Sequence, residues 1–297
     1  MSDKIPVLFI VGPTAVGKTD FAIQLAKKLD GEIVSADSRY FYRGMDIGTA
    51  KPTPEEQQGV SHHLIDVADP DETWSLALFQ READAAIRDI DQRGKLPIVA
   101  GGTGQYVRAV LEGWSVPEGE PDLRLRDAIE AWGKAIGSAE LHHKLSLIDP
   151  KAAEKIDWQN TRRTIRALEV IFSSGRRFSE QRAVKESPYM AVVIGLTRER
   201  EELYQRIDLR VDQMIQKGFV EETAALLAKG YDPELPAMSA IGYKEICAYI
   251  KGETSLEEAA QLIKFRTHAY VRRQANWFKK DDPQIHWINL SEGERTP

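Results

Sequence analysis

The sequence predicts an α/β protein in which a parallel sheet is interrupted by an all-helical insertion. Apolar runs of strand length alternate with helical apolar patterns in the first third of the 297 residues. Only helical periods occur between residues 122 and 185, and a strand-like run returns at residues 190–196. The third observation is a glycine-containing loop of the kind that binds phosphate. We therefore expect a core of residues 1–113 and 189–297, the second part mostly helical, with residues 114–188 inserted.

The first strand, residues 7–11, leads into Gly-Pro-Thr-Ala-Val-Gly-Lys-Thr and then into a helical pattern that begins at Phe21. In such a P-loop, backbone amides and the helix N-terminus converge on an anion. Lys18 adds an ammonium group, and the Thr19 hydroxyl is a predicted ligand of Mg²⁺. The core is thus predicted to resemble that of P-loop NTPases. The predicted diphosphate- or nucleotide-binding residues are Gly12, Pro13, Thr14, Ala15, Val16, Gly17, Lys18 and Thr19.

The second strand, residues 32–36, ends in Asp37-Ser38, at the sheet edge where open α/β folds bind ligands. The Asp37 carboxylate could orient magnesium, accept a proton from a substrate amine, or cap a turn. A helix over residues 75–93 precedes the third strand, residues 96–100, which ends in glycines. Nucleoside-triphosphate hydrolases usually carry an acidic residue there to hold magnesium, so that machinery is incomplete. In the following Gly-Gly-Thr-Gly turn, Thr103 is a donor or a helix cap.

A linker is predicted over residues 116–121, followed by helices over 123–136, 140–148 and 161–172. Arg162, Arg163 and Arg166 crowd one helical segment, and Arg176, Arg177 and Arg182 follow it. Such clusters face water or contact phosphates. Trp158 could stack on a base or pack in a core.

The last long helix is predicted to carry two basic ridges opposite an apolar seam that includes Tyr270. One ridge contains Lys264, His268, Arg272 and Lys279, and the other contains Arg266, Arg273 and Lys280.

Composition excludes several classes of protein. The single cysteine, Cys247, rules out an internal disulfide and a zinc site built on thiolate pairs, and its apolar neighbours predict burial. No apolar run approaches the length of a membrane span, so we expect a soluble, cytoplasmic protein. We also expect a monomer. The formal charge of −6 argues weakly against a wholly basic nucleic-acid binder.

Taken together, the motifs resemble those of the bacterial tRNA dimethylallyltransferases, also called tRNA isopentenyltransferases. The resemblance covers nearly the whole chain. Its most specific part is the run Gly-Met-Asp-Ile-Gly-Thr-Ala-Lys-Pro at residues 44–52. The other matching segments are residues 12–19, 37–39, 63–66, 101–104, 166–170, 241–245, 273–274 and 277–278.

The resemblance implies transfer of a dimethylallyl group from dimethylallyl diphosphate to the exocyclic amine of adenosine 37, beside the tRNA anticodon. Lys18, Thr19 and Mg²⁺ would then stabilise a diphosphate leaving group without any need for ATP. Asp37 is the implied base for the amine proton. Arg210 resembles the second cation that clamps the diphosphate, although Arg206, one turn earlier, is equally suited.

The implied partner besides the diphosphate donor is the anticodon stem-loop of tRNA, gripped by the insertion and the C-terminal helix. The implied tRNA-binding residues are Asp37, Ser38, Arg39, Tyr40, Thr103, Arg124, Arg162, Arg163, Arg166, Ile241, Gly242, Tyr243, Lys244, Arg272 and Arg273. The chain departs from the family pattern at Tyr40-Phe41, where Gln-Val is most frequent, and at Gln159-Asn160, where Asn-Asp is usual.

Three other functions remain open on the residues alone. A small-molecule kinase could use the same P-loop with ATP, but the missing acid after residue 99 and the basic insertion count against it. A transferase that prenylates free adenine nucleotides would not need the arginine cluster. A non-catalytic RNA-binding protein that senses nucleotides would leave Asp37 without a role.

Overall fold

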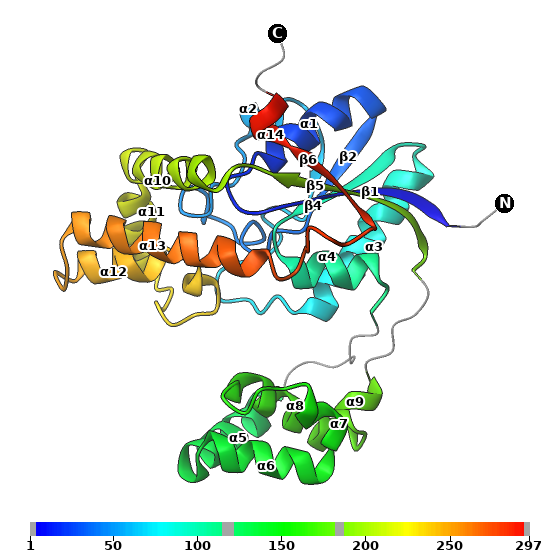
Figure 1. Cartoon of the computed structure of the whole chain (residues 1–297). Coiled ribbons are helices and arrows are strands. Elements are labelled where there is room, and N and C mark those ends of the chain that lie inside the picture. Colours follow the sequence, from blue (N-terminus) through cyan, green and yellow to red (C-terminus); the bar gives the residue numbers. More distant parts are fainter. Residues whose placement is uncertain (1–3, 115–121, 182–186, 294–297) are drawn as a thin grey trace. The chain divides into compact units, whose positions relative to one another are not determined.

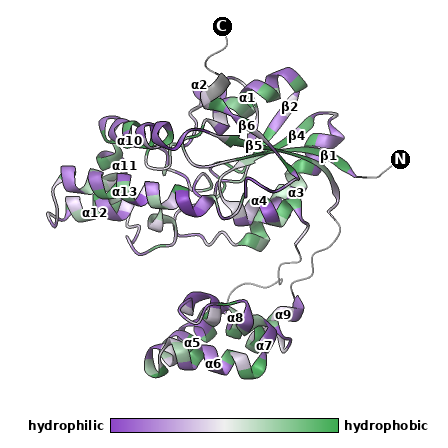
Figure 2. Cartoon of the chain, in the orientation of Figure 1, coloured by the Kyte–Doolittle hydropathy of each residue, from purple (hydrophilic) through white to green (hydrophobic). Residues whose placement is uncertain are grey.

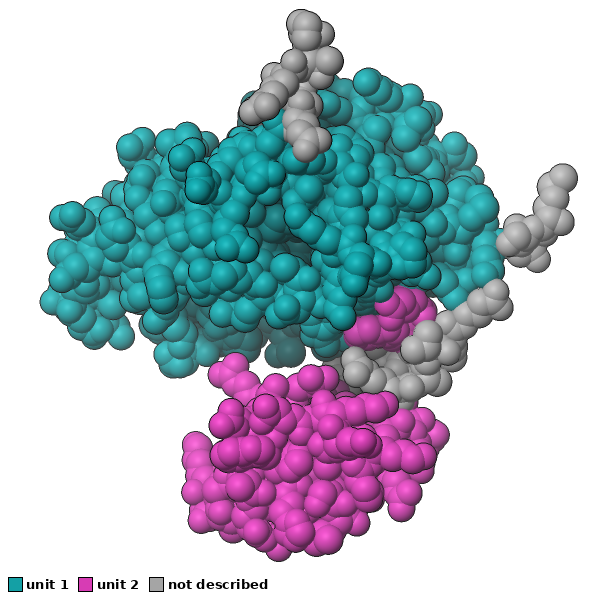
Figure 3. All heavy atoms as spheres, viewed as in Figure 1, with its two compact units in different colours: residues 1–111, 187–297 teal, residues 112–186 magenta. Residues whose placement is uncertain are grey.

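A computed structural model describes residues 4–114, 122–181 and 187–293. The chain forms two compact units, one of residues 1–111 and 187–297 and the other of residues 112–186 (Figures 1 and 3). The boundaries lie within two residues of the predicted ones. The predicted linker over residues 116–121 and Arg182 fall outside the described residues.

Unit 1 is built on a six-stranded sheet in the order β3-β2-β4-β1-β5-β6, and each neighbouring pair is parallel. Because all strands run the same way, their carboxyl ends share one edge. The predicted α/β class with a parallel core is confirmed. The strands are β1 (Ile5–Val11), β2 (Gly31–Ser35), β3 (His62–His63), β4 (Leu96–Gly101), β5 (Tyr189–Thr197) and β6 (Ile285–Asn289).

Helices cover both faces of this sheet, as the alternation of side chains along β1 requires. Phe9 packs in one buried cluster with residues of α3 (Leu76–Gln92), and Ile10 packs in another with residues of α1 (Lys18–Leu29). The central strands are accordingly hydrophobic along their length, and polar residues lie on the outer helix faces (Figure 2). The central strands are therefore buried on both faces, and the carboxyl edge of the sheet is where the loops project.

Four helices from the second part of the chain pack on one another beside the sheet (Figure 1). They are α10 (Arg200–Gln216), α11 (Phe219–Ala228), α12 (Tyr243–Ile250) and α13 (Leu256–Gln274). Ser255 and Glu258 form a capping box that fixes the start of α13. Its end at Gln274 delivers residues to the loops that follow the strands.

Unit 2 contains helices alone among its described regular elements. Its core is formed by α5 (Leu123–Ile136), α6 (Ser138–Ile148) and α8 (Thr161–Ser174), which bury Ile129, Leu141, Leu145 and Leu168. Asp122 and Asn160 cap α5 and α8. The predicted helices over 123–136, 140–148 and 161–172 are confirmed to within two residues at each end.

Several short elements, of three to eight residues, were not predicted, because so few residues carry little helical period. They are α2 (Pro54–Gln57), α4 (Gly104–Leu111), α7 (Pro150–Glu154), α9 (Phe178–Gln181), the 3₁₀ turn η1 (Ala237–Ser239) and α14 (Leu290–Gly293). The two-residue strand β3 was also missed. The Nδ1 atom of His62 donates to the carbonyl oxygen of Val60 at 2.8 Å, whereas His63 contacts Glu32, so the two rings do not converge.

None of the helices in the described part of the chain combines the length and the apolar character needed to cross a membrane. Cys247 is buried as predicted, and burial raises the pKa of its thiol.

Candidate functional site

The phosphate-binding loop, residues 12–17, connects β1 to α1. A Cβ atom at Gly12 would lie 2.6 Å from the carbonyl oxygen of Leu196 in β5, and Gly17 has a φ of +106°. Glycine is required at position 12 because there is no room for a Cβ atom, and it is favoured at position 17 because of the positive φ. Helix α1 then begins at Lys18 without a side-chain cap, which leaves its first amides available to an anion.

The Lys18 ammonium lies over this loop. Its Nζ atom donates to the carbonyl oxygens of Gly12 and Pro13, at 3.0 and 2.8 Å. Burial lowers the pKa of Lys18 to about 8; Asp37 opposes this shift and Arg210 adds to it. The lysine therefore lies between the P-loop, a carboxylate and a second cation.

Asp37 follows β2 at the carboxyl edge of the sheet. Its Oδ1 atom accepts a hydrogen bond from the amide of Arg39 at 3.0 Å, so the residue does cap a turn. The same carboxylate acts on the pKa values of Lys18, Tyr40 and Tyr270. The turn thus fixes the carboxylate where it faces the P-loop lysine, and the capping role and a chemical role are compatible.

Thr103 joins the loops that follow β2 and β4. Its Oγ1 atom accepts from the amide of Ser38 at 3.2 Å and lies 3.4 Å from the Ser38 hydroxyl. A Cβ atom at Gly101 would clash with the backbone of Ala36 at 2.4 Å, so the glycine allows this close approach. The glycine turn brings Thr103 beside the Asp37 turn.

Two residues near the end of α13 complete this edge, and the sequence reasoning missed both. Gln274 is 4% exposed; its Oε1 accepts from the Thr14 amide and its Nε2 donates to the Gly102 carbonyl, both at 2.9 Å. Tyr270, one turn earlier, interacts with Thr103, and burial together with Asp37 raises its pKa to about 12. Tyr270 and Gln274 are four residues apart, so they lie on the same face of the helix, and this spacing could have identified them as a pair. The prediction instead assigned Tyr270 to an apolar seam.

Two arginines of α10 reach the same region. Arg206 Nε donates to the carbonyl of Ala15 in the P-loop at 2.9 Å. Arg210 Nη2 donates to the carbonyl of Ala50 at 3.2 Å, and its charge acts on Lys18. The structure therefore brings both candidates to the P-loop, Arg206 to its backbone and Arg210 to the side of Lys18.

The segment of residues 44–52, the most specific part of the family pattern, is held by charged side chains. The Glu222 carboxylate of α11 accepts from the amides of Asp46, Ile47 and Gly48 at 2.8, 2.7 and 3.0 Å. Lys51 is buried and bonds the carboxylates of Asp46 and Asp66, each at 2.6 Å. These contacts fix the Ala50 carbonyl that receives Arg210.

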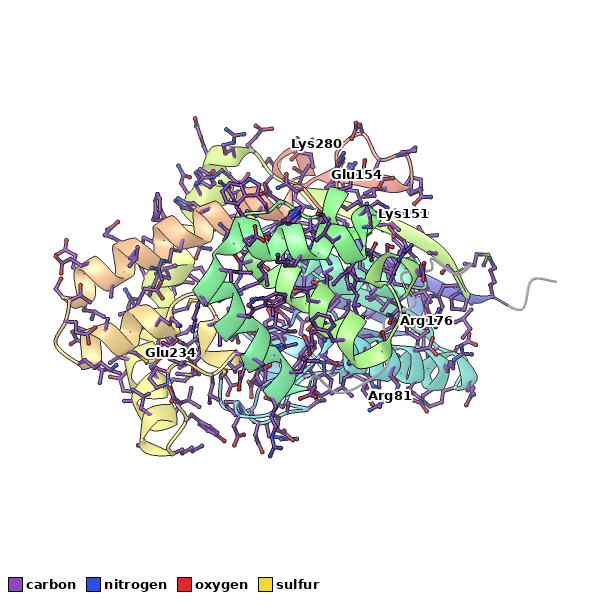
Figure 4. The ribbon with its side chains drawn as sticks, turned by 90° about the horizontal axis from the view of Figure 1, so that it is seen from below. Arg81, Lys151, Glu154, Arg176, Glu234 and Lys280 are labelled. Atoms are coloured by element: carbon purple, nitrogen blue, oxygen red, sulfur yellow. The ribbon has the colours of Figure 1, made fainter. Side chains whose placement is uncertain are left out.

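The predicted RNA contact of residues 241–244 needs correction. Tyr243 is fully buried, and its hydroxyl donates to Glu222 at 2.7 Å. Gly242 is buried too, with its amide bonded to Glu245. Both residues are buried and present no surface to RNA, and Tyr243 supports the segment of residues 44–52 through Glu222. Ile241 is half-buried, and Lys244 is exposed and paired with Glu234, which Figure 4 labels.

The remaining predicted RNA contacts of unit 1 lie at the carboxyl edge or on α13. The Arg39 guanidinium donates to the carbonyls of Pro236 and Ala237 at 3.1 and 3.4 Å. Arg272 and Arg273 are exposed at the end of α13, and Arg273 lies over the Tyr270 ring. Arg39 and Arg273 thus keep their charge near the Asp37 and Thr103 loops, whereas Arg272 donates to the Tyr204 hydroxyl of α10 at 3.4 Å.

The two basic ridges predicted on α13 do not exist as continuous surfaces. Lys264 pairs with Asp212 and His268 with Asp208, both of α10, and Arg266 pairs with Glu245. The helix ends at Gln274, so Lys279 and Lys280 lie on the turn before β6, where Figure 4 labels Lys280. The prediction of the two ridges was wrong because the helix packs against carboxylates of other elements, and the sequence of the helix alone does not reveal them.

In unit 2 the predicted group of three arginines divides. Arg166 pairs with Glu169 at 3.0 Å, and Arg126 of α5 binds the same carboxylate at 2.9 Å. Because Glu169 is 1% exposed, both arginines compensate a buried charge. Arg166 thus contributes to the fold of unit 2, and its contact with phosphate stays a prediction.

Arg162 and Arg163 are exposed, and neither guanidinium has a partner within the described residues. An open hollow of about 460 Å³ is lined by residues 157 and 159–162. Trp158, between them, is 51% exposed and takes no part in the unit 2 core. Arg124 is also exposed, on α5. Unit 2 therefore offers free guanidinium groups and an exposed aromatic ring in one segment.

Fold and site together define a P-loop α/β protein that presents a carboxylate, a lysine and two arginines to an anion site and carries a helical insertion. Two family models match: IPP transferase over residues 40–281 and isopentenyl transferase over residues 5–69. The chain belongs to the IPP transferase family.

Named relatives agree. A tRNA dimethylallyltransferase of Thermomicrobium roseum is 50% identical over 292 residues, covering 98% of this chain and 88% of the relative. A tRNA dimethylallyltransferase of Roseiflexus sp. is 52% identical over 276 residues, covering 93% of this chain and 90% of the relative.

Two solved structures extend the likeness to three dimensions. A tRNA isopentenylpyrophosphate transferase of Bacillus halodurans has a TM-score of 0.71 at 45% identity, covering 96% of this chain and 90% of that one. A eukaryotic dimethylallyltransferase acting on tRNA has a TM-score of 0.84 at 29% identity, covering 98% of this chain and 75% of that one.

Proposed function

We propose that this protein transfers a dimethylallyl group from dimethylallyl diphosphate to the N6 amine of adenosine 37 in tRNA, giving N6-dimethylallyladenosine and diphosphate. The observation that carries the proposal is the meeting of Lys18, Asp37 and Thr103 at one sheet edge. These residues follow three different strands, and they supply a cation for a leaving diphosphate, a base for an amine and a hydroxyl for orientation. Relatives named for this activity, aligned over nearly the whole chain, support it.

The bond changes assign a role to each group. The bond between the allylic carbon and the diphosphate oxygen breaks, and its electron pair leaves with the diphosphate. A bond forms between that carbon and N6, and the N6 proton passes to the Asp37 carboxylate. Lys18, Arg210 and the amides at the start of α1 face the growing negative charge, and they are held in place before the reaction begins.

Mg²⁺ fits this site as a partly protein-bound ion. The described residues contain no group of three or more carboxylate, histidine or cysteine side chains that would form a closed metal cage. Magnesium at phosphates typically takes one or two protein oxygens and completes its shell with phosphate and water. The Thr19 hydroxyl would hold the ion, which would neutralise charge on the diphosphate.

Recognition of the anticodon stem-loop is the role we propose for Arg162, Arg163 and Arg124 of unit 2, together with Arg39, Arg272 and Arg273 of unit 1. Adenosine 37 must leave its stack for N6 to reach Asp37, and unstacking costs least in a loop. Exposed guanidinium groups suit the surrounding phosphates.

A direct test is to incubate the purified protein with labelled dimethylallyl diphosphate and bulk tRNA that lacks the modification. Label should appear in tRNA at adenosine 37, and pyrophosphate should be released in equal amount. ATP in place of the donor tests the small-molecule kinase alternative, which the absence of an acid after β4 disfavours. Label that enters free adenine nucleotides but not tRNA would overturn the proposed acceptor.

A further inference from the structure

Tyr40 occupies a position that its place in the sequence does not explain. It follows the Asp37 turn, and its hydroxyl donates to the carbonyl of Ala50 at 3.0 Å. Arg210 donates to that same carbonyl at 3.2 Å. The Tyr40 hydroxyl also interacts with the side chains of Arg210 and Thr19. The phenol group therefore lies between the start of α1 and the second cation of the anion site.

Such a position suits a contact with the anion more than a contact with RNA. Thr19 is in the first turn of α1, where the free amides point at a bound diphosphate. A hydroxyl can rotate about its C–O bond and exchange one acceptor for another at little cost. If the Tyr40 hydroxyl turns to a phosphate oxygen, Arg210 still satisfies the Ala50 carbonyl, so no buried acceptor is left without a donor.

We propose that the Tyr40 hydroxyl donates a hydrogen bond to the leaving diphosphate, beside Lys18 and Arg210. This inference rests on the proposed function, because it concerns the leaving group of that reaction. When the allylic C–O bond breaks, negative charge moves onto the diphosphate oxygens, and a donor already in place stabilises that charge.

The phenol keeps its proton in this environment. Burial and the Asp37 carboxylate raise the pKa of Tyr40 to about 12, while Arg210 and Thr19 act in the opposite direction. The hydroxyl is therefore a donor throughout the neutral range and contributes no negative charge that would repel the diphosphate. A tyrosine can serve here where the family pattern most often has glutamine, because both side chains carry a donor group.

The test compares Tyr40→Phe with wild-type enzyme. Hydrogen bonds to charged groups are worth enough that kcat/KM for the donor should fall about tenfold to a hundredfold, with KM for tRNA unchanged. Inorganic pyrophosphate, measured by calorimetry without any turnover, should bind about tenfold more weakly. Tyr189→Phe is the matched control. Tyr189 begins β5, at the opposite edge of the sheet, and its hydroxyl donates to Asp84 of α3.

A double variant separates direct contact from indirect positioning. If Tyr40 acts only by holding Arg210, Tyr40→Phe should change nothing in an Arg210→Gln background. We expect instead that the loss of pyrophosphate affinity persists there. Disappearance of the effect, or unchanged pyrophosphate affinity in the folded single variant, would overturn the inference. An inactive wild-type enzyme would count against the proposed function alone, because pyrophosphate binding is read independently.

Discussion

Three cations at the P-loop site are held differently from the ion-paired arginines elsewhere in the molecule. At the site, Lys18, Arg206 and Arg210 donate to backbone carbonyl oxygens, and none of them has a carboxylate ion pair within the described residues. Elsewhere, Arg93 binds Glu32 and Arg126 binds Glu169. A carbonyl fixes the position of a cation without cancelling its charge, whereas a carboxylate does both.

Unit 2 repeats this contrast on a small scale. Arg166 is neutralised by Glu169, and Arg162 and Arg163, on the same helix, remain uncompensated and exposed. We infer that carbonyl-held or free cations are available to phosphate, and that carboxylate-paired cations serve the fold.

The largest effect is expected from Asp37→Asn, which removes the proposed base but keeps the turn geometry. Turnover should fall by about a hundredfold to ten-thousandfold, with donor and tRNA affinities within a few-fold of wild type. Single-turnover kinetics with labelled donor measure the chemical step. Asp20→Asn, in the exposed first turn of α1, removes the same charge from the same region and should leave turnover nearly intact. Equal turnover in wild type and Asp37→Asn would end the base assignment.

The second prediction concerns the carbonyl-held Lys18 and follows from its pKa of about 8. Below that pH the free enzyme carries the ammonium, and above it the lysine becomes neutral, so diphosphate loses its cation. We expect kcat/KM for the donor to fall with a limiting slope of about tenfold per pH unit above pH 8.

Lys18→Arg provides the control, because a guanidinium stays charged throughout this range. The variant should be slower at neutral pH and should lack the alkaline limb. If the alkaline limb of the pH profile persists unchanged in Lys18→Arg, the group that titrates near pH 8 is not Lys18.

Some residues of the site could be predicted from the sequence and others could not. The P-loop, Asp37 and Thr103 were found because strand–loop–helix order and sheet-edge position follow from local patterns. Glu222 and Gln274 were not found as site-building residues, because each holds a loop more than a hundred residues away in sequence. Their role depends on tertiary contacts that no local spacing encodes. The same reason explains why the three arginines of α8 could not be divided into free and paired members.

A smaller effect is expected from replacing both Arg162 and Arg163 by glutamine. If each contacts one phosphate, the slope of log K against log salt for tRNA binding should decrease by about 0.7 to 0.9 per contact. Pyrophosphate affinity should stay at the wild-type value. Lys144→Gln, at a partly exposed lysine of α6 paired with Glu140, is a control that should preserve the slope. Equal slopes for the double variant and wild type would move the RNA contact to Arg272 and Arg273.

The smallest effect on RNA binding is expected from Arg166→Gln, although this residue lies on the same helix. Its guanidinium is bound to the buried Glu169, so the salt slope for tRNA should not change, whereas unit 2 should lose stability by about 1 kcal/mol. The loss stays modest because Arg126 still compensates the carboxylate. Arg126→Gln should cost more, since Arg126 makes three hydrogen bonds to Glu169. Urea unfolding of the full chain ranks the two variants. A reduced salt slope in folded Arg166→Gln would show that carboxylate pairing does not withdraw an arginine from RNA, and the distinction between free and paired cations would fail in unit 2.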